Sequence, residues 1–474
     1  MRSPGYVLIL LLIAAGSVFF ITRIGIAAGI GLVLIPFLLL YLHWLFRKPI
    51  TGLYTAIILG FTLLGMARYI RSDIQIGLVM DAVLVLTWIA LLMSGFNKKI
   101  DWGPAKNEIT LLAAIWFGYS LLQFFNPEIQ SRTAWFSGVR GISVYMMMLV
   151  PLVLLFMNDK RKLDVFFTLW GIFSILVSIK GILQMTVGVD PWEKMWLATD
   201  SGSTHLIFGN LRAFSFLTDA GQFGANQAYS AVVAAVLFFA GKKPKRRLFF
   251  LLVAVLGIAG MFLSGTRGAI SIPLAGFALF FILRKSGPVL ISGVVFLAVV
   301  FVFFKFTYLG HDNQYIRRMR TAFNPNDPSL LVRFENQKKL NTYLSSRPFG
   351  GGIGHAGVKA KTYVGNTFLS NIATDSWYVL IWAETGIVGL ALHLCILLYI
   401  IIKASYLIMY LLRDPVLKLK MSALAAGMMG IMVASYGNAV LGTMPTSILV
   451  YTSMALLLNA RQFDTSPDEA DVKP

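Results

Sequence analysis

The sequence contains a single cysteine and few charged residues. Because Cys395 is the single cysteine, no disulfide can form within the chain, and a metal site built from several thiolates is excluded. Cys395 itself lies inside an apolar run. Charged residues make up 13% of the 474 residues, about half the share in a soluble globular protein. The sequence also has no Walker motif, no dinucleotide fingerprint and no cluster of metal-ligand residues. These absences argue against a soluble enzyme built around a nucleotide or a metal.

Apolar residues make up 57% of the chain, and the mean hydropathy is +0.74. Long apolar runs alternate with short polar connections, so we predict an all-α, polytopic integral membrane protein with no separate water-soluble domain. We expect the first run to be an uncleaved helix, because no small-residue cleavage site is followed by a soluble domain. About fourteen runs have bilayer-spanning length: 6–22, 24–46, 50–70, 74–95, 108–125, 139–157, 164–187, 222–241, 247–264, 268–284, 287–304, 376–402, 421–441 and 446–460.

The charge of the chain is strongly basic, with 41 Lys and Arg against 21 Asp and Glu and a formal net charge of +20. The basic residues gather in alternate short connections, for example 158–162 and 242–247. Because cytoplasmic loops of membrane proteins are rich in Lys and Arg, this alternation predicts that both termini are cytoplasmic. It also places every long connection on the outer face. The basic excess is therefore mostly a topology signal, and we expect no nucleic-acid partner.

The chain divides into four predicted parts. They are N-terminal transmembrane helices (1–187), core transmembrane helices whose outer connections carry Arg212 and Arg267 (188–304), a large extracytoplasmic loop (305–375), and C-terminal transmembrane helices with a cytoplasmic tail (376–474). The loop separates the eleventh and twelfth predicted helices. A connection of about 70 residues is far longer than usual, and such connections generally carry function. We therefore expect the active site there.

The large loop contains one predicted helix and two further candidate site residues. Asp327, followed by proline, is typical of an N-cap and predicts a helix over Ser329–Ser346. His355 follows the glycine-rich residues 350–354 and is either a base or a surface histidine. Arg320 and its neighbouring arginines either bind acidic sugars or lipid head groups, or are simply solvated.

Four polar residues fall on the outer face under a topology that was derived without them. Arg212 precedes a helix, Arg267 lies in a very short turn, Arg333 lies in the loop helix, and Asp375 lies at the mouth of the twelfth helix. An arginine between two helix ends is costly unless it meets an anion or a carboxylate. Alternatively, its side chain extends to the interface. The shared face favours a common anion-binding site.

Asp375 has two possible roles. Its carboxylate can accept the proton of an attacking hydroxyl as a general base. An Asp just before an apolar run is also a common N-cap. The two roles are not exclusive.

Three other charged residues lie inside predicted helices. Asp81 and Lys180 are functional candidates because intramembrane charges are costly, but each can instead be paired within the bundle. We expect Glu384 to form hydrogen bonds inside the bundle. Outside the helices, Asp190–Trp196 carries two tryptophans and predicts a short helix at the membrane interface.

Several of these residues together resemble a known family. The motifs are Ser-Gly-Thr-Arg-Gly at 264–268, Arg333 ahead of Arg-Pro-Phe-Gly-Gly-Gly-Ile-Gly at 347–354, and Asp375-Ser376 ahead of Glu-Thr-Gly-Ile-Val-Gly at 384–389. Their order and spacing resemble the O-antigen ligase and polymerase superfamily, which includes WaaL-like lipopolysaccharide ligases and Wzy-type polymerases. The resemblance covers mainly the chain from Arg212 to Leu390.

The resemblance implies a glycosyltransferase that needs neither a metal nor a cofactor. It would lie in the bacterial inner membrane with its active site on the outer face. It would move a glycan from undecaprenyl diphosphate to a hydroxyl on a glycan, lipid or protein acceptor. By the same resemblance, Arg212 and Arg267 bind the diphosphate, Arg333 contributes to substrate binding, and Asp375 occupies the place of the catalytic residue.

The reaction within the superfamily depends on this last position. The ligases carry His-Asn or a similar pair where this chain has Asp375-Ser376. We therefore favour a polymerase of surface polysaccharide, with a ligase as the alternative. A flippase of lipid-linked oligosaccharides is the alternative from another class. A transporter is expected to show paired broken helices or internal repeats, and the sequence shows none.

Overall fold

The computed structural model describes residues 26–70, 76–96, 99–199, 202–207 and 209–464. Its two strands, β1 (Leu206–Ile207) and β2 (Asn210–Leu211), pair antiparallel. The helices of the described residues are α2 (Ile26–Arg47), α3 (Ile50–Met66), α4 (Gly77–Ser94), α5 (Glu108–Leu122), α6 (Arg132–Val139), α7 (Tyr145–Phe156), α8 (Lys160–Thr186), α9 (Pro191–Leu197), α10 (Gly202–His205), α11 (Ala220–Ala240), α12 (Pro244–Leu263), α13 (Ser271–Leu283), α14 (Gly287–Phe306), α15 (Gln314–Arg320), α16 (Pro328–Leu344), α17 (Lys361–Val364), α18 (Phe368–Asn371), α19 (Trp377–Tyr406), α20 (Pro415–Ala434) and α21 (Thr446–Leu458).

The predicted all-α, polytopic membrane class is confirmed. In the part of the chain that the structure describes, 9 helical stretches are long and apolar enough to cross a membrane. Shorter apolar helices occupy four more predicted spans, at 33–47, 50–66, 267–283 and 446–458. The first predicted span, 6–22, lies outside the described residues, so the number of fourteen spans stays a prediction.

The chain forms two compact units. Of the described residues, those within 26–54 and 82–100 form the smaller unit, and those within 55–81 and 101–464 form the larger unit. In the larger unit, α11 lies at the centre and packs against α12, α20 and α13. Its Ala- and Gly-rich surface is buried along most of its length, as expected where small residues let helices approach closely.

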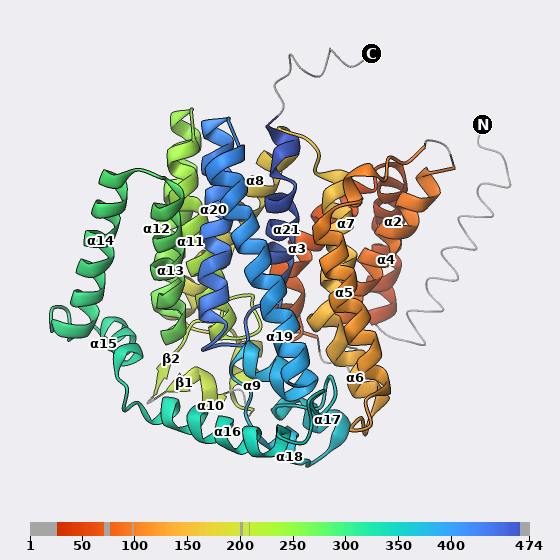
Figure 1. Cartoon of the computed structure of the whole chain (residues 1–474). Coiled ribbons are helices and arrows are strands. Elements are labelled where there is room, and N and C mark those ends of the chain that lie inside the picture. The colour runs from red at the N-terminus through yellow and green to blue at the C-terminus, as the bar shows by residue number, and fades with distance from the viewer. Residues whose placement is uncertain (1–25, 71–75, 97–98, 200–201, 208, 465–474) are drawn as a thin grey trace. The chain divides into compact units, whose positions relative to one another are not determined.

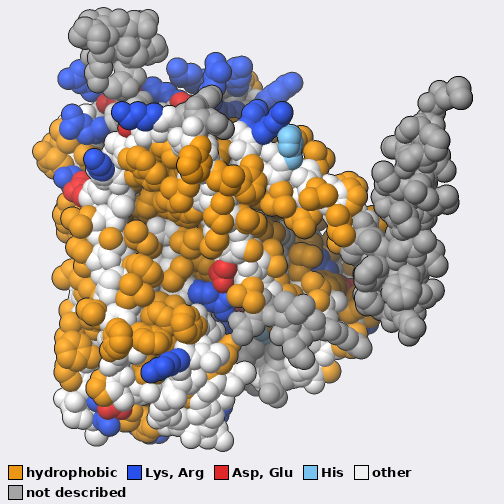
Figure 2. All heavy atoms as spheres, turned by 90° about the vertical axis from the view of Figure 1, so that its right-hand side faces the viewer, with side chains coloured by type: hydrophobic (Ala, Val, Ile, Leu, Met, Phe, Trp, Pro, Cys, Tyr) orange, Lys and Arg blue, Asp and Glu red, His pale blue; other side chains and the backbone are white. Residues whose placement is uncertain are grey.

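Lys and Arg side chains are unevenly distributed on one face of the molecule. On the face drawn in Figure 2, apolar side chains cover the middle, while Lys and Arg side chains gather at the upper end. In Figure 1, α12 and α20 begin at this upper end, and α16 lies crosswise beneath the lower ends of the upright helices. The Lys- and Arg-rich end of this face and α16 thus lie at opposite ends of the helices.

The loop helix forms nearly where it was predicted. It is α16, and the side chain of Asp327 accepts a hydrogen bond from the Ser329 amide as the predicted N-cap. Pro328 occupies the first helical position, where its missing amide hydrogen costs nothing. Buried Leu340 and Leu344 attach the far end of α16 to the start of α19.

The helix predicted at 376–402 is interrupted in the structure. Gly386 has a φ of 70°, and a Cβ there would lie 2.0 Å from the Pro348 carbonyl oxygen. The amides of residues 351–352 donate hydrogen bonds of 2.9 and 3.0 Å to the carbonyls of residues 383–384. The glycine-rich loop therefore pairs with the backbone beside the kink in α19, a contact that the apolar pattern could not reveal.

Candidate functional site

A cavity of about 1080 Å³ lies at the end of the larger unit that α16 covers. Its walls come from the start of α11, the turn before α13, α15, α16, the loop after α16 and the start of α19. Charged residues on its lining are Arg212, Arg267, Arg318, Arg333, Lys359, Asp219, Asp327, Asp375 and Glu384. The four residues predicted to share one face (Arg212, Arg267, Arg333 and Asp375) therefore line one cavity.

Arg212 lies on the cavity wall, and its hydrogen-bond acceptors are all neutral. Its guanidinium donates to the carbonyls of Ser264 (3.0 Å) and Thr204 (2.8 Å) and to the Thr266 hydroxyl (3.0 Å). No carboxylate of the described residues forms an ion pair with it. Burial, reinforced by the nearby cation of Arg318, lowers the pKa of Arg212 to about 10, so the side chain stays charged at neutral pH.

Arg318 shares the same turn. Its Nε donates a hydrogen bond of 2.5 Å to the Gly265 carbonyl. Gly265 has a φ of 56°, and a Cβ there would lie 2.8 Å from Arg318 Nε and 3.7 Å from Arg212 Cγ. Burial and the neighbouring Arg267 lower the pKa of Arg318. Glycine at this position thus lets Arg318 approach the turn that Arg212 also contacts.

Arg267 connects the turn to the loop helix. It forms an ion pair with Asp327 and donates 2.6 Å to the Ser329 hydroxyl. Burial opposes ionisation of Asp327, but hydrogen bonds from Ser329 and Arg267 outweigh it and lower the pKa of this carboxyl. The N-terminus of α16 is therefore held over the cavity by the arginine of the short turn.

Asp375 faces the cavity and does not cap α19. Ser376 is the N-cap, with its hydroxyl accepting from the Val379 amide, so the N-cap interpretation of Asp375 is wrong. The Asp375 carboxylate lies 3.5 Å from Arg333 Nε, and its side chain is 58% exposed. It is therefore accessible to a substrate in the cavity.

His355 is a buried residue, and the expectation of a surface histidine is wrong. Its side chain is 3% exposed. Nε2 accepts hydrogen bonds from the amides of Gln130 (3.0 Å) and Ser131 (3.1 Å), and Nδ1 lies 3.0 Å from the Ile353 carbonyl. Both ring nitrogens are thus engaged, and the residue does not line the cavity.

Arg320 also lies away from the cavity lining. It donates to the Leu309 carbonyl (2.6 Å) and approaches the Thr307 hydroxyl (3.3 Å). Of the arginines in α15, Arg318 lines the cavity instead. Two residues apart on a helix, these side chains point in different directions, so the run of arginines in the sequence could not identify which one faces inward.

The charges predicted inside helices are paired. Asp81 accepts hydrogen bonds from Arg140 (2.9 Å) and from the Tyr145 hydroxyl (2.8 Å). Lys180 lies 3.2 Å from carboxylate oxygens of Asp190 and Glu193. Pairing within the bundle is confirmed for Asp81, whereas the partners of Lys180 lie at the start of α9, outside the predicted spanning helices.

Glu384 and Lys359 also line the cavity, and neither was predicted as a site residue. Buried Glu384 accepts a hydrogen bond of 3.3 Å from the Ala356 amide. The loop after α16, which carries Lys359, pairs with the backbone beside the kink in α19 next to Glu384, and no short sequence motif signals that contact.

The arginines of the cavity differ in whether a carboxylate pairs with them. Arg267 and Arg333 each have a carboxylate partner, whereas Arg212 and Arg318 have no ion pair within the described chain. The guanidinium group stays charged and can bind two phosphate oxygens at once. The turn at 264–268 therefore presents positive charge that an anionic group with several oxygens can neutralise.

The fold and the cavity define a polytopic membrane protein with an arginine cluster at one end of its helices. Residues 252–394 match the family model described as O-antigen ligase. This match confirms the predicted relationship to the O-antigen ligase-related superfamily, whose members are glycosyltransferase-like enzymes acting on lipid-linked oligosaccharides. The matched region contains Arg267, Arg318, Arg333 and Asp375, whereas Arg212 precedes it. A comparison with curated proteins gave no match.

Proposed function

We propose that this protein transfers a glycan from undecaprenyl diphosphate to an acceptor hydroxyl during synthesis of a surface polysaccharide. The reaction would take place on the outer face of the bacterial inner membrane, with both termini cytoplasmic. The arginine cluster around Gly265 is the observation that carries this proposal, because Arg212 and Arg318 are held in one cavity without carboxylate partners.

The arginine cluster suits the leaving group of such a transfer. Breaking the bond between the anomeric carbon and the diphosphate leaves negative charge on the diphosphate oxygens. Fixed cations aimed at those oxygens stabilise the transition state. Arg212 and Arg318 would bind them directly, and Arg267 would exchange the Asp327 carboxylate for a phosphate oxygen. Arg333, on α16, would contact the substrate from the other side.

Asp375 would act as the general base. Its carboxylate would accept the proton of the acceptor hydroxyl while that oxygen forms a bond to the anomeric carbon. The anomeric C–O bond to the diphosphate breaks, and its electron pair leaves with the lipid diphosphate. The exposed carboxylate on the cavity wall supports this role, because a base must reach the hydroxyl within hydrogen-bond distance.

Polymerisation is the preferred reaction, with the acceptor hydroxyl on a second glycan. It is favoured by aspartate at position 375, where the related ligases carry a histidine. Ligation to a lipid or protein acceptor uses the same donor site and the same base. The length of the product distinguishes the two reactions.

Purified protein reconstituted with a defined undecaprenyl-diphosphate oligosaccharide tests the proposal. A ladder of elongated glycans is expected from a polymerase, and a single added unit on a supplied acceptor from a ligase. Arg267→Lys should lower turnover by roughly tenfold or more, because an ammonium cannot reproduce the bidentate contact. Arg320→Lys, outside the cavity, is the matched control and should remain active. Equal activity of the two variants would contradict the proposed donor site.

A further inference from the structure

The segment between Arg212 and the start of α11 is fixed from outside the cavity by one arginine of the N-terminal half. Arg68, just after α3, donates to three backbone carbonyls of this segment. The acceptors are Ser215 (3.0 Å), Leu217 and Thr218 (2.8 Å). Arg68 does not line the cavity, so its guanidinium serves the segment and not the substrate.

Two aromatic rings enclose the same guanidinium. The Arg68 guanidinium carbon lies 4.3 Å from the ring centroid of Trp196 and 4.5 Å from that of Phe214. Trp196 belongs to α9, while Phe214 belongs to the segment itself. Stacking on aromatic faces is a contact that arginine makes and that lysine reproduces poorly. Arg68 thus joins α9 to the segment as well as binding its carbonyls.

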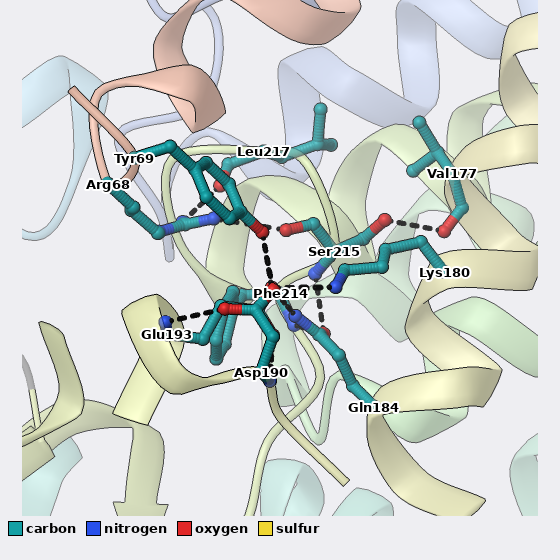
Figure 3. A network of polar contacts seen from close by, with 10 residues as sticks. All are labelled: Arg68, Tyr69, Val177, Lys180, Gln184, Asp190, Glu193, Phe214, Ser215 and Leu217. Atoms are coloured by element: carbon teal, nitrogen blue, oxygen red, sulfur yellow. Dashed lines mark hydrogen bonds and ion pairs between the residues drawn. The ribbon is translucent and has the colours of Figure 1, made fainter. Parts of the chain in front are cut away.

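A buried set of charges holds α9 in place beside this contact. The Tyr69 hydroxyl donates to Asp190 (2.8 Å), and Lys180 pairs with Asp190 and with the fully buried Glu193. Figure 3 shows the hydroxyl of Tyr69, from the turn after α3, and the ammonium of Lys180, from α8, approaching this pair of carboxylates. The charge of buried Glu193 is tolerated because Lys180 pairs with it.

Gln184 links these charges to the segment. Its amide nitrogen donates to Glu193 (2.7 Å), and its amide oxygen accepts from the backbone of Phe214 (3.1 Å) and Ser215 (2.8 Å). Figure 3 shows Gln184 between the carboxylates and the segment. Side chains from the turn after α3, from α8 and from α9 therefore converge on the stretch that follows Arg212.

The end of α3 also touches the segment through its backbone. A Cβ on Gly65 would lie 1.8 Å from the Phe216 carbonyl oxygen. This contact is independent of the polar network, and it leaves no room for the segment to shift toward α3. On the other side, the Ala213 amide donates 3.1 Å to the Leu263 carbonyl, just before the turn that carries Arg267.

We infer that Arg68 is a positioning residue that holds Arg212 toward the diphosphate, which rests on the proposed function. Arg68 donates hydrogen bonds to carbonyls within residues 215–218. Arg212, at the start of this stretch, contacts the turn at 264–268. If the Arg68 contacts are lost, three carbonyls lose a charged donor and the stretch gains freedom. The conformation in which Arg212 faces the cavity is then less populated.

A double-mutant cycle with farnesyl diphosphate, a soluble polyprenyl diphosphate, tests this inference. The variants are Arg68→Gln, Arg212→Gln and the double variant, each as the full chain in detergent. Arg68→Gln should weaken binding about tenfold, the size expected from losing charge-assisted hydrogen bonds that orient a ligand group. In the Arg212→Gln background the same change should weaken binding less than about twofold, because its effect passes through Arg212.

Arg246→Gln is the matched control, because the Arg246 guanidinium also approaches an aromatic ring and donates hydrogen bonds, in its case to the Asp164 carboxylate, but at the start of α12. It should leave binding unchanged. A purely structural role for Arg68 predicts equal weakening in both backgrounds, and that result would overturn the inference. If Arg68→Gln does not fold, Arg68→Lys is carried through the same cycle with the same criterion. If Arg212→Gln itself binds normally, the proposed diphosphate site fails instead.

Discussion

Arg333 Nε lies 3.5 Å from Asp375 Oδ2 and so joins the loop helix α16 to the mouth of α19. Both side chains are partly exposed, and ion pairs of this kind contribute at most about 1 kcal/mol. The pair can therefore open readily when a substrate enters. It keeps an arginine and a candidate base together on the cavity wall without tying up the carboxylate.

Asp375→Asn should abolish most of the turnover and spare the fold. An amide cannot take up the acceptor proton, so turnover should fall by roughly two to four orders of magnitude. Because Ser376 caps α19 and the ion pair is weak, the free energy of unfolding should change by less than about 1 kcal/mol. Turnover with a defined lipid-linked donor and thermal unfolding in detergent check the two parts.

Ser376→Ala is the converse control for the Asp375 prediction. It removes the N-cap, so stability should fall by about 1 kcal/mol, while turnover well below the unfolding temperature should persist. Near-parent turnover in Asp375→Asn would show that the base lies elsewhere.

His355 should make stability depend on pH. Burial lowers its pKa below the ordinary value of 6.5, so the unfolded chain takes up a proton first as the pH falls. The stability from neutral His355 is present above pH 6.5 and is lost as the pH falls from there toward the native pKa. Between pH 7.5 and 5.5 the parent should lose more stability than His355→Gln does.

Thermal unfolding in detergent at the two pH values measures that difference. The other histidines are common to both proteins and cancel in the comparison. Parallel pH profiles for parent and variant would show that His355 is not held neutral by its two amide donors.

The kink in α19 should require glycine. Gly386→Ala should lower stability by at least about 2 kcal/mol, because the left-handed φ disfavours a side chain and the Cβ would meet the Pro348 carbonyl. Gly118→Ala in α5 is the control, since a Cβ there meets nothing within 4 Å. It should be neutral or stabilise by about 0.5–1 kcal/mol. Equal unfolding temperatures for the two variants would contradict the strained geometry.

The orientation in the membrane can be tested by cysteine labelling in intact cells. Cys395 is exposed, so Cys395→Ser provides the background for single cysteines. An impermeant maleimide should label Asn326→Cys, beside the N-cap of α16. Lys245→Cys, at the basic end, should react only after the membrane is permeabilised. Labelling of position 245 from outside would reverse the predicted topology.

Part of the site could be predicted because the distribution of Lys and Arg among the connections extends over the whole chain. The alternation of basic connections placed Arg212, Arg267, Arg333 and Asp375 on one face, and the structure brings them to one cavity. The N-cap role of Asp327 could be predicted from the sequence, because an N-cap depends on only two or three neighbouring residues.

The remaining features depend on contacts between distant segments. Arg318 faces inward because a glycine at 265 leaves room for it, which no run of arginines can reveal. The apolar pattern predicted a continuous helix through Gly386, because the kink there depends on contact with the glycine-rich loop. No local motif points to Arg68, because its acceptors lie about 150 residues further along the chain.

The most direct test of the account is a cryo-electron microscopy map of the protein with bound undecaprenyl diphosphate. The account predicts density for the two phosphates within hydrogen-bond distance of the guanidinium groups of Arg212 and Arg318, with Arg267 turned from Asp327 toward a phosphate oxygen. Phosphate density elsewhere, with Arg267 still paired to Asp327 and no contact to Arg212, would contradict it.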